Sequence, residues 1–144
     1  ARMLAWFGLL SLGGILVAGP ASDRVGNRMP MAVTFGLRVA LFLVIVFVKG
    51  TIAFWVFALG FGFTLLVTAP LTTTLAGRLY GFTHIGVIGG FITTVHHVGG
   101  GLWAYLGGVI YDSTGGYEVA FIVSAVLSAV AVACTIAIRE ERGG

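Results

Sequence analysis

The sequence predicts an all-α, polytopic membrane bundle of five transmembrane helices, and three observations lead to this fold class. Hydrophobic residues make up 58% of the 144 residues and charged residues only 9%, whereas a soluble domain carries about 25% charged residues. The mean hydropathy is +1.07. Long uncharged runs separate the few charged residues. Such runs favour helices over transmembrane strands, because strand residues alternate in polarity and these do not.

Five segments are long enough to cross the hydrocarbon core of a bilayer, which takes about 20 residues of helix. The first lies between Arg2 and Asp23, and the second is apolar except for Arg38. The third is uncharged and has Pro70 near its end, and the fifth is also uncharged. The predicted spans, within a single membrane domain fragment over residues 1–144, are 3–22, 29–48, 50–77, 84–111 and 119–138.

The fourth span needs a separate argument because its uncharged run is too long for one upright helix and too short for two with a turn. Gly99, Gly100 and Gly101 lie inside this run. A kink, a break or a long tilted helix would each fit this run, and of the three we expect one helix with a kink. The same span has small residues at a spacing of four, which usually indicates close helix packing; they are Gly86 and Gly90, and Gly100, Ala104 and Gly108.

The charged residues predict the orientation. Five spans place the first and third connections on the same side as the C-terminal tail. That side has five cationic side chains, Arg24, Arg28, Arg78, Arg139 and Arg142, and the opposite side has two, Arg2 and Lys49. Cytoplasmic loops are enriched in Lys and Arg, so we expect a multi-pass protein of the plasma (inner) membrane with a cytoplasmic C-terminus. Cations scattered singly do not indicate a nucleic-acid partner.

Two spans end in the same spacing of residues. Both 19–26 and 108–115 read G-x-x-x-D-x-x-G, and the two stretches fall on opposite sides of the predicted membrane. Inverted three-helix repeats of transporters leave this kind of trace. The repeat would make the chain a six-helix bundle without its first helix. The alternative is that Gly and Asp simply recur at helix ends.

Residues 19–28 read GPASDRVGNR, which closely resembles the cytoplasmic signature G-x-x-x-D-R-x-G-R-[KR] of the major facilitator superfamily. Asn27 stands where the family usually has Arg. The resemblance implies that this loop is a conformational latch between two halves of a transporter. The alternative is a solvated loop whose charges set the topology. The matching residues are Gly19, Asp23, Arg24, Gly26 and Arg28.

A second stretch, 107–121, resembles the family's join between its eleventh and twelfth helices. We therefore expect helices eight to twelve of the C-terminal half, in a fragment whose partner is the missing N-terminal half. The last two spans are similar to the monocarboxylate and oxalate/formate transporter branches. The resemblance implies a partial major facilitator fold and secondary active transport of a small-molecule substrate, with an organic anion as a candidate, by alternating access among membrane lipids.

Polar side chains inside the predicted spans are candidates for a substrate or proton pathway, because ionisable groups at membrane depth are costly and histidine titrates near neutrality. These residues are Thr93, Thr94, His96 and His97. The alternative is a histidine hydrogen-bonded in a packed interface. Arg38 is an intramembrane charge that either binds an anion or has a structural role. The family places its ninth helix outside the bundle, which favours the structural role.

The sequence contains no motif of an enzyme. We find no catalytic triad spacing, no HExxH and no phosphate-binding loop, and the single cysteine, Cys134, has no metal-ligand spacing around it. We therefore expect no catalytic residues, no metal and no cofactor. His96 and His97 make proton symport the expected coupling. Two alternatives remain open. One is a five-span membrane protein with a structural or assembly role, and the other is a small intramembrane enzyme that uses the histidine pair.

Overall fold

A computed structural model describes residues 2–139, with side chains from residue 5 onward. Arg142 and the side chain of Arg2, which entered the charge count above, lie outside the described residues. The described residues form α-helices and short connections, without a strand, and five segments are long and apolar enough to cross a membrane. The predicted fold class is thus confirmed. The helices are α1 (Arg2–Val25), α2 (Arg28–Phe47), α3 (Thr51–Leu65), α4 (Thr68–Tyr80), α5 (Ile85–Thr114) and α6 (Glu118–Ala137).

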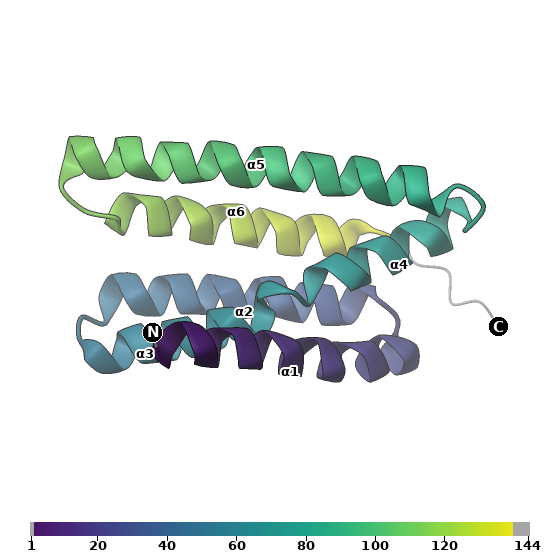
Figure 1. The fold of residues 1–144 in the computed structure, drawn as a ribbon, viewed down its shortest axis with the longest axis horizontal. Helices are drawn as coiled ribbons and strands as arrows, with labels where there is room; N and C mark the ends of the chain where they lie inside the picture. The colour runs from purple at the N-terminus through teal and green to yellow at the C-terminus, as the bar shows by residue number, and fades with distance from the viewer. Residues whose placement is uncertain (1, 140–144) are drawn as a thin grey trace.

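The helices run up and down between two ends of an elongated bundle (Figure 1). The α1–α2 and α4–α5 connections lie at one end, and the α2–α3 and α5–α6 connections lie at the other. The arginine-rich connections therefore share one end, as the alternation of five spans requires. At the opposite end Lys49 Nζ pairs with Glu118 Oε1 at 2.9 Å, which joins the α2–α3 connection to the start of α6.

The third span is broken, which differs from the single helix expected over 50–77. Helix α3 ends at Leu65 and α4 begins at Thr68. Pro70 explains the break, because it has no N–H to donate to the carbonyl of Leu66 and its ring collides with that carbonyl. The break lets a span of 30 residues change direction within the bundle.

The kink expected in the fourth span is not found. Helix α5 is uninterrupted from Ile85 to Thr114 and passes straight through its three consecutive glycines (Figure 1). Glycine lowers helix propensity by about 1 kcal/mol, but it keeps its backbone donor and causes no collision. A proline disrupts a helix far more strongly, by about 3 kcal/mol, so the interruption falls at Pro70.

Helices α1 and α5, which carry the repeated G-x-x-x-D-x-x-G spacing, are each followed by a glycine in the left-handed conformation. Gly26 has φ 84° and Gly115 has φ 74°. The N–H of Gly26 donates to the carbonyl of Ser22 at 2.9 Å, and that of Gly115 donates to Tyr111 at 2.8 Å. This bond satisfies a carbonyl that the helix end leaves unpaired. The last position of the two stretches thus has one geometry at opposite ends of the bundle (Figure 1).

Close packing joins α1 to α3 through two glycines. A methyl group at Gly14 would overlap the backbone carbonyl of Phe63, and one at Gly62 would lie 3.1 Å from Cα of Phe7. Small residues allow such backbone approach between membrane helices. The spacing of small residues in α5 does not have this role here, because methyl groups at Gly86, Gly90, Gly100 or Gly108 would meet nothing within the described chain.

Helix α5 forms one edge of the bundle (Figure 1). None of its residues is buried within the described chain. Its side chains still make specific contacts with a neighbour, because Trp103 Nε1 donates to Ser124 Oγ of α6 at 3.1 Å. The buried core lies elsewhere, where α1, α2 and α4 meet around Ala18, Met31 and Leu71.

Candidate functional site

A cavity of about 390 Å³ lies between α2, the α3–α4 break and α5. Three separate elements bring polar side chains to its wall. Helix α2 contributes Arg38, and α5 contributes Thr93, His96 and His97. Helix α4 contributes three threonines. The lining residues are Phe35, Arg38, Leu65, Leu66, Thr68, Ala69, Thr72, Thr73, Ile92, Thr93, His96 and His97.

Arg38 binds the broken end of α3. Its Nη2 donates to the carbonyl of Thr64 at 2.7 Å and to that of Leu65 at 3.4 Å. Its Nε donates to Thr64 Oγ1 at 3.3 Å. The last carbonyls of a helix have no partner within the helix and carry partial negative charge. The guanidinium therefore caps α3 at the point where Pro70 interrupts the span.

Aromatic rings enclose the same guanidinium. The Arg38 Cζ atom lies 5.6 Å from the ring centre of Phe35 and 5.4 Å from that of Phe61. Cation–π attraction at such distances is worth about 0.5–2 kcal/mol. Together with the carbonyl bonds, it offsets part of the cost of about 2.5–3.5 kcal/mol for an arginine at the centre of a membrane helix.

The two histidines differ in their hydrogen bonding. His97 Nδ1 lies 2.8 Å from the carbonyl oxygen of Thr93. A carbonyl oxygen only accepts, so Nδ1 carries the hydrogen and donates it to Thr93. The His96 ring stands at 89° to that of His97, with 5.6 Å between their centres. Both rings border the cavity although the two side chains diverge.

The threonines of α4 border the cavity with their hydroxyls bonded to their own helix. Thr72 Oγ1 donates to the carbonyl of Thr68 at 2.7 Å, and Thr73 Oγ1 donates to that of Ala69 at 3.1 Å. Their lone pairs remain able to accept. Thr94, a predicted pathway residue, is not in the cavity lining, and its hydroxyl donates to the carbonyl of Gly90 at 2.9 Å.

The residues of the signature lie mostly in helix. Gly19, Asp23 and Arg24 belong to α1, which ends at Val25 rather than at 22, and Arg28 begins α2. Asp23 and Arg24 are exposed. The connection itself is only Gly26 and Asn27. A left-handed glycine makes such a short connection possible.

Asn27 has a role that the sequence did not reveal. Its side chain is 0% exposed, and its Nδ2 donates to the carbonyl of Leu71 in α4 at 3.0 Å. This bond fixes the α1–α2 connection to α4, the helix that carries the three threonines of the cavity wall. Thr64, 2% exposed, is the other residue that the sequence left unnoticed. Thr64 is 26 residues from Arg38 and lies on another helix, so the sequence does not indicate their contact.

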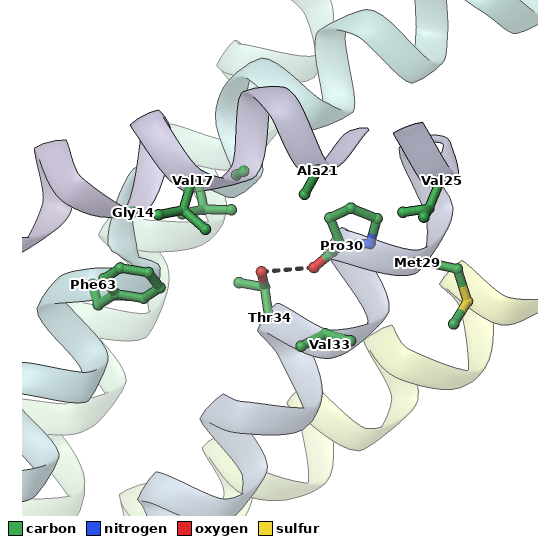
Figure 2. Close-up of a pocket in the computed structure, with 11 residues that line it drawn as sticks. Gly14, Val17, Ala21, Val25, Met29, Pro30, Val33, Thr34 and Phe63 are labelled. Carbon is green, nitrogen blue, oxygen red and sulfur yellow. Dashed lines mark hydrogen bonds between the residues drawn. The ribbon is translucent and has the colours of Figure 1, made fainter. Parts of the chain in front are cut away.

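A second cavity, of about 540 Å³, lies between α1, α2 and the α3–α4 break and is almost wholly apolar. Figure 2 shows its wall, with Val17, Val33 and Phe63 around the space. The hydroxyl of Thr34 donates to the carbonyl of Pro30 at 2.8 Å and so offers the space no hydrogen-bond donor (Figure 2). Of these two cavities, the one beside α5 therefore has the groups able to bind a polar ligand.

The comparison with protein families agrees with this architecture. Residues 3–143 match the model described as Major Facilitator Superfamily. The chain belongs to this superfamily. It is 33% identical over 121 residues to the uncharacterized MFS-type transporter YcxA of Bacillus subtilis (strain 168), in a match that covers 80% of this chain and 30% of that relative. The chain thus spans about a third of the relative's length. No solved structure gives a significant match.

Membership of the major facilitator superfamily confirms the resemblance read from the signature. This is a superfamily of membrane transporters, so the membership counts against the alternative of a small intramembrane enzyme. Assignment to the monocarboxylate or oxalate/formate branch stays a prediction. Within residues 2–139, no group of three or more His, Cys, Asp and Glu side chains is placed to hold a metal ion.

Proposed function

We propose that this chain is part of a secondary active transporter that moves a small solute, of the organic anion class, across the membrane by alternating access. The observation that carries the proposal is the cavity between α2, α4 and α5, whose wall combines Arg38, His96 and His97. Polar groups that converge on an otherwise apolar cavity are typical of solute sites. Substrate sites of such carriers lie near the bilayer midplane, and Arg38 is midway along α2.

We propose further that transport is coupled to protons through the histidine pair. His97 has the better geometry, because its bond to Thr93 fixes the ring and leaves Nε2 for the proton. The other charged or titratable residues in the cavity wall are Arg38 from α2 and His96 from α5; α4 contributes only uncharged residues. A proton on His97 makes the cavity more cationic and favours an anion there.

The other helices of the carrier are proposed to lie in a longer protein, with this chain as helices eight to twelve and a six-helix half as partner. The exposed pair Asp23 and Arg24 at the end of α1 supports a latch role, because both side chains are available to another element. Arginines at one end of the bundle support a cytoplasmic position for that end and for the C-terminus in the plasma membrane.

The coupling is tested by measuring uptake into proteoliposomes. They contain the protein expressed from the complete reading frame that includes these residues. His97→Gln is expected to reduce uptake driven by a proton gradient at least about tenfold, which corresponds to about 1.4 kcal/mol, and His96→Gln to reduce it less. His84→Gln is the matched control, because His84 precedes α5 and is outside the cavity lining. An unchanged uptake and pH profile in both cavity variants would remove the pair from the mechanism.

A further inference from the structure

We propose that Arg38 binds the carboxylate group of the solute, and that the carboxylate replaces the carbonyls of Thr64 and Leu65 as the partner of the guanidinium. The inference rests on the proposed function, since it names the group that recognises the transported anion. Arg38, for which the sequence analysis favoured a structural role, would thus exchange one hydrogen-bond partner for another.

The first step is the unused capacity of the guanidinium. An arginine has five N–H donors. The hydrogen bonds of Arg38 come from Nε and Nη2, and within residues 5–139 no bond from Nη1 is seen. The residue also borders the cavity. Donors are therefore available to a ligand before any existing bond is broken.

The second step is the charge of the cavity. Arg38 carries a permanent positive charge, and His96 and His97 add to it when protonated. No aspartate or glutamate is among the described residues that line the cavity. A carboxylate would thus supply the counter-charge that the wall lacks, and apolar neighbours of Arg38 such as Phe35 and Leu65 strengthen its attraction to the guanidinium.

The third step is the competition between partners. Two of the three bonds of Arg38 are long, at 3.3 Å to Thr64 Oγ1 and 3.4 Å to the carbonyl of Leu65. Hydrogen bonds weaken at such distances. All present acceptors are neutral, whereas a charged acceptor makes a bond roughly twice as strong, and the planar guanidinium suits a bidentate carboxylate.

The exchange has a mechanical consequence for the third span. Arg38 now caps α3 where Pro70 interrupts the span, and α4 beyond the break carries Thr72 and Thr73 in the same cavity wall. When the carboxylate takes the guanidinium, the end of α3 loses its cap. Occupation of the cavity is thereby linked to the angle between α3 and α4.

The test measures binding by calorimetry. The sample is the purified protein in detergent, expressed from the complete reading frame that contains these residues. The probes are acetate, lactate and succinate, the corresponding amides, and inorganic phosphate. At least one carboxylate is expected to bind, and its amide to bind at least about tenfold more weakly. Arg38→Gln is expected to weaken the carboxylate at least about thirtyfold, the scale of losing one partner of a buried charge pair.

Two further variants separate binding from structure. Thr64→Val removes one competing acceptor but leaves the cap carbonyls, so carboxylate affinity is expected to rise about two- to tenfold. An arginine with only a structural role would give no such rise, even if Arg38→Gln fails to fold. Lys49→Gln is the control, because it removes a cation that is exposed and pairs with Glu118 at the bundle end. The carboxylate affinity of this variant is expected to be unchanged.

The outcomes distinguish this inference from the proposed function. Equal carboxylate affinity in wild type and Arg38→Gln, or preference for phosphate over every carboxylate, overturns the inference. Absence of carboxylate binding also overturns it. If proteoliposomes then still take up the neutral amides, transport of a small solute stands, but the organic anion class falls together with this inference. If they take up none of the probes and no other solute, the transport proposal fails as well.

Discussion

Asn27 illustrates how one side chain can fix a connection between helices. It is completely buried, and its amide donates to the carbonyl of Leu71. A buried amide that keeps its hydrogen bond avoids the desolvation cost of an unpaired polar group. The family signature usually has an arginine at this position, and a fully enclosed position of this size does not suit that longer, charged side chain. The departure from the signature is thus a packing feature of this chain.

Asn27→Ala is expected to lower the free energy of unfolding by about 1–3 kcal/mol, because it removes the bond to Leu71 and leaves a void. Arg24→Ala is the matched control in the same signature, since Arg24 is exposed; its effect is expected to stay within about 0.5 kcal/mol. Reversible unfolding in mixed detergent micelles measures both. Equal losses in the two variants would show that the buried amide contributes nothing specific.

At the scale of helices, the crossing of α1 and α3 depends on backbone approach. Gly14 faces the backbone of Phe63, and Gly62 faces that of Phe7. The stacked rings of Phe7 and Phe61, 6.4 Å apart, continue the same contact. Dispersion across such a surface, rather than exclusion of water, holds membrane helices together, so any added atom at the crossing separates the helices.

Gly14→Ala is expected to weaken the α1–α3 contact by about 1–3 kcal/mol, the scale of overpacking, although alanine is the better helix former. Gly13→Ala is the neighbouring control, because a methyl group there meets nothing; it is expected to be neutral or to stabilise by up to about 1 kcal/mol. Thermal unfolding of both variants in detergent measures the difference. A stability gain from both would show that α1 and α3 do not approach closely.

The sequence predicted the helices better than their interruptions. Uncharged runs gave five spans because length and polarity alone decide whether a helix crosses a bilayer. The kink expected in the fourth span is not found, whereas the third span, for which one helix was expected, is interrupted before Pro70, since only a proline removes a backbone donor. The left-handed end at Gly26 was predictable from its glycine, but the extension of α1 to Val25 was not, because Asp23 and Arg24 read as loop charges.

At the scale of the whole chain, the candidate site combines residues from separate helices, and the sequence does not indicate that they meet. His96, His97 and Arg38 were each recognised as unusual at membrane depth. Their meeting with the break after Leu65 depends on the crossing of α2 with α3 and α4, and no periodicity within one span encodes that crossing. Thr64 was missed for the same reason, because one threonine in an apolar run is unremarkable until an arginine lies beside it.

The isolated chain is expected to transport nothing. None of the residues of α5 is buried within the described chain, so one side of the cavity wall has no further covering element. Alternating access needs two bodies that rock against each other. Reconstitution of the 144 residues alone into liposomes, with the uptake of the carboxylate and amide probes measured against empty liposomes, tests this. Flux above that background would contradict the expectation.

The break in the third span also constrains how the chain enters a bilayer during synthesis. Helix α3 has 15 residues and α4 has 13, and each is shorter than the roughly 20 residues that reach from one membrane surface to the other. Neither piece is long enough to span the bilayer by itself, so we expect the two to enter the membrane together. Pro70 therefore lies at a point where the polypeptide cannot be divided into two separately expressed parts without stranding a half-length helix in lipid.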